Sequence, residues 1–215
     1  MKTRYIPGVS LHWPAENRAQ ILASPGQRIV DRWRAAHKAQ GWRDIGYHYV
    51  VHRDQAGQWH VYPGRPDSLP GAHSGTNAGN KYLGINVAYG MDEGLPAEAF
   101  QRLARLIAEL SDKYGFPINR HTVKGHREFL PTSCPGNPLF NRLDELVRTA
   151  TALKKGCKLP EQPPADQEEE QIVPVKVVFK GKPLDGVLIN SQAFVSVYEL
   201  GKPEWNPQTR TVTLK

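Results

Sequence analysis

A proline-rich, acidic segment divides this chain into two parts of unequal length. It reads KKGCKLPEQPPADQEEEQ from Lys154 onward and holds three prolines and five acidic residues, with no apolar periodicity. A segment of this composition cannot bury enough apolar surface to fold and is typical of an extended linker. We therefore predict a larger domain over residues 1–153, a linker over residues 154–172 and a small domain over residues 173–215.

The larger part alternates between strand and helix patterns. Strand patterns occur at YIPGVSLHW, GYHYVVH, QWHVYPG and YLGINVAYG, and the second and third suggest a hairpin around a turn at DQAG. Apolar residues at helical spacing predict helices at about residues 25–40, 96–114 and 138–153. This order predicts an α/β fold in which a mixed central β-sheet is flanked by helices.

Strand alternation assigns several polar residues to a side of this sheet, because successive side chains of a strand point to opposite faces. We expect His12 to lie on the face opposite to Leu11. In GYHYVVH, we expect Tyr47 and Tyr49 to share one face and His48 to lie on the other. These faces decide which polar side chains can meet.

The C-terminal part has a purely β pattern, seen in VPVKVVFKG, GVLINSQAFVSVYEL and RTVTLK. A part of about 40 residues is too short to bury a large core. We predict a small β-rich domain that is marginally stable alone or that leans on a partner.

The charge of the chain narrows its possible partners. Its 28 Lys and Arg against 21 Asp and Glu give a formal net charge of +7. A basic surface suits a polyanion such as nucleic acid or an anionic cell wall. We expect no nucleic-acid partner, because the chain has neither an arginine-rich helix nor an aromatic nucleic-acid motif.

Two further features bear on location. No apolar run approaches the roughly 18 residues needed to span a bilayer, so we expect no membrane insertion. The N-terminal stretch MKTRYIPGVSLHWPA lacks the apolar core of a secretory signal. We expect cytoplasmic synthesis without a signal peptide, a setting in which Cys134 and Cys157 stay reduced.

Histidine and cysteine occur together in GHREFLPTSCPG, where His126 precedes Cys134 by eight positions. Pro131 and Pro135 favour a loop between them. Catalytic zinc sites use three protein ligands from His, Cys, Asp or Glu and keep one position open. His12, at the end of the first strand, is the natural third candidate. Taken singly, each of these residues is more often structural, as a polar strand end, a packed imidazole or a buried thiol.

Four segments, in this order, resemble the zinc-dependent N-acetylmuramoyl-L-alanine amidases, a family shared by phage endolysins and peptidoglycan-recognition proteins. They are SLHWPA, GWRDIGYHYVVHRD, GAHSGTNAGNKYLGINVAYG and GHREFLPTSCPG. The resemblance implies that Zn²⁺ is the cofactor and that His12, His126 and Cys134 are its ligands. It also implies two catalytic residues, Tyr47 and Thr132.

The same resemblance suggests roles for further polar residues. Tyr47 would position or deprotonate the attacking water. Thr132 stands where phage members often carry lysine, so its hydroxyl can donate to the developing oxyanion but brings no positive charge. His73, Asn77 and Asn80 lie on a glycine-rich loop that borders the substrate groove in the family. They are candidates for substrate binding, and support of turns is the alternative for the asparagines.

The C-terminal part resembles the small domain named for the N-terminus of copper amine oxidases. The resemblance rests on a glycine-lysine turn, a strand that runs into a short helix at SVYELGK and a final hairpin at WNPQT. Residues 173–215 contain neither His nor Cys and therefore no copper ligand. The resemblance implies a domain that binds the cell wall.

The sequence thus predicts a peptidoglycan hydrolase that cleaves the amide between N-acetylmuramic acid and the L-alanine of the stem peptide. We expect a monomeric endolysin that acts on the cell wall after its release. Two alternatives stay open. One is a recognition protein that binds peptidoglycan without cleaving it, and the other is a zinc endopeptidase that acts within the stem peptide.

Overall fold

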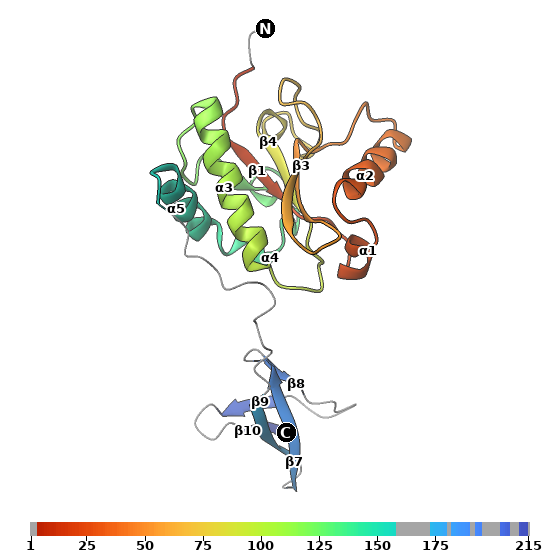
Figure 1. Ribbon diagram of the computed structural model, residues 1–215, viewed down its shortest axis with the longest axis vertical. Helices are drawn as coiled ribbons and strands as arrows, with labels where there is room; N and C mark the ends of the chain where they lie inside the picture. The colour runs from red at the N-terminus through yellow and green to blue at the C-terminus, as the bar shows by residue number, and fades with distance from the viewer. Residues whose placement is uncertain are drawn as a thin grey trace. The chain divides into compact units, whose positions relative to one another are not determined.

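The protein is described here by a computed structural model (Figure 1), which covers residues 4–157 and five strands at 173–179, 182–189, 192–194, 203–206 and 211–214. The chain separates into two compact units, Met1–Leu159 and Pro160–Lys215. Over the described residues, no helix combines the length and the apolar character that crossing a membrane requires.

The first unit is built on a five-stranded sheet with the order β3-β2-β4-β1-β5. Its strands are β1 (Val9–His12), β2 (Tyr49–Arg53), β3 (Trp59–Pro63), β4 (Leu83–Val87) and β5 (Val123–Gly125). Strand β1 runs parallel to β4 and β5, and the central strand β4 also runs parallel to β2. β2 and β3 pair antiparallel. The predicted hairpin and the predicted mixed sheet are both confirmed.

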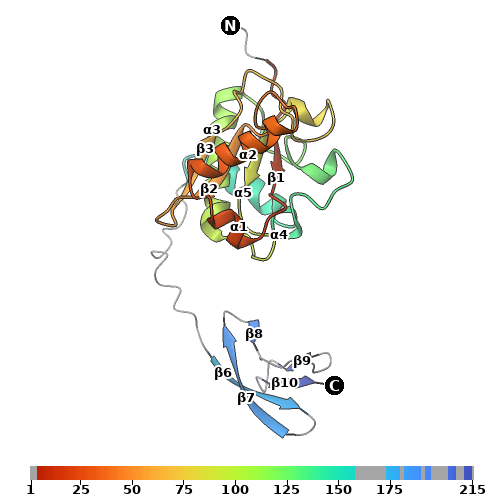
Figure 2. The same ribbon diagram turned by 90° about the vertical axis from the view of Figure 1, so that its right-hand side faces the viewer.

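Helices cover both faces of this sheet. They are α1 (Arg18–Leu22), α2 (Gln27–Ala39), α3 (Ala97–Tyr114), α4 (Asn137–Phe140) and α5 (Leu143–Lys154), with short 3-10 turns η1 (Gly79–Lys81) and η2 (His126–Glu128). α3 and α5 lie together on one side of the sheet and α2 lies on the other (Figure 1). Figure 2 views the sheet from the α2 side. The two faces are called here the α3 face and the α2 face.

The predicted helix over residues 96–114 is confirmed as α3. Its apolar stripe, with Leu103 and Ile107 fully buried, packs on the sheet. Burial of one such side chain contributes about 1.5–3 kcal/mol. Gly115 ends the helix in the left-handed conformation, at φ 74°, which glycine adopts without strain.

Other helix boundaries differ from the prediction. The second helix begins at Gln27 instead of Pro25, after Gly26 at φ 62°. The helix predicted over residues 138–153 is divided into α4 and α5, with a break at Asn141 and Arg142. No periodic pattern predicted α1, whose five residues are held by a capping box formed by Asn17 and Gln20.

The predicted faces are confirmed for β1 and wrong for Tyr47. Leu11 packs in the α3-face core, and His12 points to the opposite face. Tyr49 also packs against the α3-face core, whereas Tyr47 packs with the α2-face cluster. The alternation rule fails because β2 begins only at Tyr49, so Tyr47 precedes the strand. Tyr47 and His12 therefore share a face.

The second unit contains a five-stranded sheet with the order β8-β7-β6-β10-β9. Its strands are β6 (Val173–Phe179), β7 (Lys182–Ile189), β8 (Gln192–Phe194), β9 (Pro203–Asn206) and β10 (Thr211–Leu214). β9 and β10 pair antiparallel, as the predicted final hairpin requires. The short helix predicted at SVYELGK lies outside the described residues.

Candidate metal centre

Three side chains that can bind a metal converge at the carboxyl ends of β1 and β5. His12 ends β1, His126 follows β5, and Cys134 lies on the loop beyond. Because β1 and β5 are parallel neighbours, with Leu11 opposite Gly125, their ends meet at the same edge of the sheet. One potential ligand atom from each of the three residues lies within 4.8 Å of the other two. Cys134 Sγ is 3.6 Å from His12 Nδ1.

The loop that returns Cys134 to this edge is held by its own hydrogen bonds. The Arg127 backbone N–H donates to the Cys134 carbonyl over 3.0 Å. The Arg127 guanidinium also donates to the carbonyls of Ser133 and Cys134. Thr132 Oγ1 accepts from the Cys134 backbone N–H over 3.2 Å. The half-buried Thr132 hydroxyl thus uses one of its two lone pairs, and among the described residues its proton has no acceptor.

The donor atoms suit a bound cation. His126 Nε2 is buried and has no hydrogen-bond partner among the described residues, as expected of an atom whose partner is a metal. Burial lowers the pKa of His12 and of His126, which keeps both rings neutral, as ligation requires. Burial raises the pKa of Cys134 to about 11. A bound divalent cation acts against that shift, because it stabilises the thiolate.

His73 lies directly behind His12 and orients its ring. His73 Nε2 is 3.2 Å from the Tyr82 carbonyl oxygen, which only accepts, so this nitrogen carries the proton. Burial lowers the pKa of His73 to about 3, so the ring is neutral and its Nδ1 accepts. His12 Nε2, 3.0 Å away, must then be the donor, and Ser10 Oγ is a second acceptor at 3.0 Å. The lone pair of His12 is left on Nδ1, the nitrogen that faces Cys134.

This position favours a role for His73 in orienting His12, and contact of His73 with substrate stays an untested prediction. The side chain is 8% exposed, and both ring nitrogens have partners inside the protein. Two glycines make the room that it occupies. A Cβ atom at Gly84 would lie 2.2 Å from His73 Cδ2, and one at Gly71 would lie 2.3 Å from it. The sequence signal for this enclosed position of His73 was a pair of glycines, Gly71 in GAHSG and Gly84 in YLGIN, which leave room for a neighbouring side chain.

The two asparagines of the same loop differ from each other. Asn80 Oδ1 accepts hydrogen bonds from the backbone N–H groups of His73 and Ser74 and from the Ser74 hydroxyl. Asn80 therefore supports the turn, the role named above as the alternative to substrate binding for the two asparagines. Asn77 is exposed, and contact with substrate remains a prediction for it.

Tyr47 and Asn86 complete the polar surroundings of His12. The Tyr47 ring centroid lies 5.3 Å from that of His12 and 6.2 Å from that of Trp33. Burial raises the pKa of Tyr47 to about 12. Asn86 is opposite His12 in the β1–β4 register and is buried. Asn86 was not predicted as a site residue, and its available signal was one polar residue within the apolar strand LGINV.

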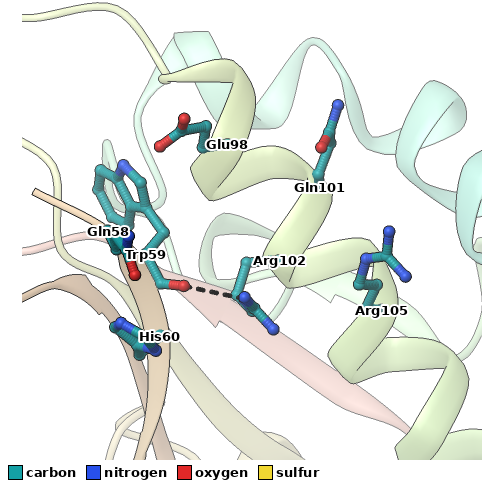
Figure 3. Close-up of a pocket in the computed structure, with 7 residues that line it drawn as sticks. All are labelled: Gln58, Trp59, His60, Glu98, Gln101, Arg102 and Arg105. Carbon is teal, nitrogen blue, oxygen red and sulfur yellow. Dashed lines mark hydrogen bonds between the residues drawn. The ribbon is translucent and has the colours of Figure 1, made fainter. Parts of the chain in front are cut away.

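A groove on the other side of the sheet is separate from this centre. It has a volume of about 340 Å³ and is lined by Gln58, Trp59, His60, Glu98, Gln101, Arg102 and Arg105. Figure 3 shows that these side chains do not converge on one point. Arg102 Nε donates to the Trp59 carbonyl over 2.9 Å, which ties α3 to β3. The groove lies on the α3 face, whereas His12 lies on the α2 face.

Comparison with known proteins gives consistent similarities over the first unit. The family model described as N-acetylmuramoyl-L-alanine amidase matches residues 3–137. An N-acetylmuramoyl-L-alanine amidase of Sus scrofa is 34% identical over 123 residues, which are 57% of this chain and 19% of that protein. An endolysin of Klebsiella phage KP32 is 32% identical over 117 residues, which are 51% of this chain and 69% of that protein.

Solved structures repeat the fold. Drosophila PGRP-LB matches with a TM-score of 0.52 and 25% sequence identity, over 66% of this chain and 82% of that chain. The curated relatives extend beyond the matched region, since this chain spans about a fifth of the porcine protein and about two thirds of the phage protein. The matched region contains His12, His126 and Cys134.

Proposed function

Because this chain belongs to the N-acetylmuramoyl-L-alanine amidase family, we propose that it hydrolyses the amide between N-acetylmuramic acid and the L-alanine of the peptidoglycan stem peptide. The observation that carries the proposal is the convergence of His12, His126 and Cys134 at one edge of the sheet. A protein that only binds peptidoglycan has no need of a thiol among two imidazoles. The convergence therefore favours catalysis over recognition alone.

We infer that the metal is zinc. Two imidazole nitrogens and one cysteine sulfur are a donor set that zinc favours, and three protein ligands leave a fourth position open. When bound, zinc supplies a Lewis acid that polarises the scissile carbonyl and makes water more acidic. His73 and Ser10 hold the His12 ring in the orientation that this site requires.

The remaining steps belong to the protein's own hydroxyl groups. An amide is a poor electrophile with a poor leaving group, so the attacking water must be oriented and the developing charge stabilised. We assign the first task to Tyr47, which stands beside His12 on the α2 face. We assign the second to Thr132, whose hydroxyl accepts from the Cys134 backbone N–H and can donate its own proton to the carbonyl oxygen. Neither residue brings a positive charge.

The biological setting proposed is lysis of a bacterial cell by a monomeric endolysin that reaches the wall after release. The likeness to a phage endolysin supports this setting. The second unit would attach the protein to the wall, as its resemblance to the small domain of copper amine oxidases suggests. Its net positive charge over residues 173–215 suits an anionic wall polymer.

Digestion of purified peptidoglycan sacculi with the zinc-loaded full chain tests the activity. Mass spectrometry should find new free L-alanine amino termini on released stem peptides, with intact glycan strands. Amino groups from within the peptide would identify an endopeptidase instead. Protein that stays bound to uncleaved sacculi would identify a recognition protein, and either result would refute the proposed amidase.

The position of His73 gives a prediction that separates metal support from substrate contact. His73→Phe removes both ring nitrogens, and we expect zinc affinity to fall by about 10- to 100-fold, as for other residues that orient a ligand. The KM for peptidoglycan of the zinc-saturated variant should stay unchanged. Competition with a chromogenic zinc chelator measures the affinity, and Asn77→Ala is the control expected to bind zinc normally. A raised KM with normal zinc affinity would support substrate contact instead.

A further inference from the structure

Asn86 lies in the middle of the sheet beside the metal-binding residues. In β4, its Cα is paired with His12 of β1 and with Val50 of β2. Ile85 and Val87, its neighbours in the strand, both belong to the α3-face core. By alternation, Asn86 therefore faces the α2 side, as His12 does. The Asn86 side chain is only 1% exposed.

The amide of Asn86 is unfavourable for the stability of the fold. Neither Oδ1 nor Nδ2 has a hydrogen-bond partner among the protein groups that the structure describes. A buried amide that stays unpaired loses its hydration without compensation. An apolar side chain at this position in a central strand would avoid that loss. An unpaired buried polar group in a native fold calls for a functional explanation.

The hydroxyl of Tyr47 is the polar group that Asn86 can serve. Burial is the main influence on the pKa of Tyr47 and raises it, whereas the approach of the Asn86 side chain lowers it. The Tyr47 ring stands beside the His12 ring, and apolar residues of the α2-face cluster surround it, including Trp33 and Val50. The α2 face thus contains a buried cluster of polar side chains within an apolar layer, made up of Asn86, Tyr47 and His12.

We propose that Asn86 is a positioning residue for Tyr47 in the amidase reaction, an inference that rests on the proposed function. An amide offers an acceptor at Oδ1 and donors at Nδ2. When Nδ2 donates to the Tyr47 oxygen during the reaction, that oxygen keeps a second lone pair that accepts a hydrogen bond from the attacking water. Asn86 itself touches neither water nor substrate, and the enclosed position of its side chain agrees with that role.

Asn86→Leu keeps the approximate size of the side chain and removes both polar atoms. We expect kcat to fall by about 10- to 100-fold, as when a reacting group is misplaced. KM and the zinc content, one ion per chain, should stay unchanged. The melting temperature of the metal-free protein should rise by about 2–4 °C, because the unpaired amide is gone. Asn86→Val is the second variant if leucine is too large for the site.

A double-mutant cycle with Tyr47→Phe tests whether Asn86 acts through the Tyr47 hydroxyl. In that background, Asn86→Leu should change kcat by less than about two-fold, because the group that it positions is already absent. Asn80→Leu is the matched control for stability. Asn80 Oδ1 accepts three hydrogen bonds, so its loss should lower the melting temperature.

The possible outcomes separate this inference from the proposed function. Lower turnover together with a higher melting temperature and non-additivity supports the positioning role. A lower melting temperature of both Asn86 variants, lost zinc, or additive effects with Tyr47→Phe would overturn it. The measurement of melting temperature does not depend on turnover. A wild-type protein that fails to cleave sacculi would refute the amidase function itself.

Discussion

Cys134→Ala is expected to lose zinc and amidase activity together. The substitution leaves only the imidazoles of His12 and His126, and it removes the one ligand that carries negative charge. We expect zinc affinity to fall by more than the roughly 100-fold that loss of a supporting residue causes. Metal analysis after dialysis and release of stem peptides from sacculi measure the two losses.

The matched control for this variant is Cys157→Ala. Cys157 is exposed and is the other cysteine of the chain. Its replacement removes a thiol that is not part of the metal centre, so it shows whether the loss of any thiol lowers zinc content or activity. Zinc content and turnover should both equal those of the wild type. A Cys134→Ala protein with full activity would refute the assignment of Cys134 as a ligand, whatever its zinc content.

Tyr47→Phe is expected to keep zinc and lose most of its turnover. The phenylalanine ring fills the same space against Trp33 but cannot orient water. The loss of a group that handles protons in the reaction should lower kcat by about 100-fold or more. Single-turnover cleavage of a soluble muramyl peptide, with zinc content measured on the same sample, gives both quantities.

Tyr49→Phe is the matched control, two positions along the chain. The Tyr49 hydroxyl donates to Asp67 Oδ2 over 2.6 Å on the α3 face, away from His12. Its removal should leave kcat unchanged and lower the free energy of unfolding by about 1 kcal/mol. Equal kcat values for the Tyr47→Phe protein and the wild type would exclude a catalytic hydroxyl at this position.

The sequence determined the elements whose signals are local. The 3.6-residue period of α3 and the turn between β2 and β3 are properties of short segments, and both were predictable. The candidate ligands were predictable too, since resemblance over ordered motifs pointed to His12, His126 and Cys134. Their convergence then follows from the parallel pairing of β1 and β5, whose ends meet at one edge.

Tertiary structure alone decided how the surroundings of the metal centre are arranged. His73 reaches His12 across 61 positions of the chain and is enclosed between glycines of two different segments, so no local pattern distinguishes it from a substrate-binding loop residue. Tyr47 departs from strand alternation because β2 begins after it. The amide of Asn86 is enclosed between neighbouring strands, where it has no hydrogen-bond partner among the residues that the structure describes. A side chain's face within a regular element is set by local geometry, but its partners outside that element are set by long-range packing.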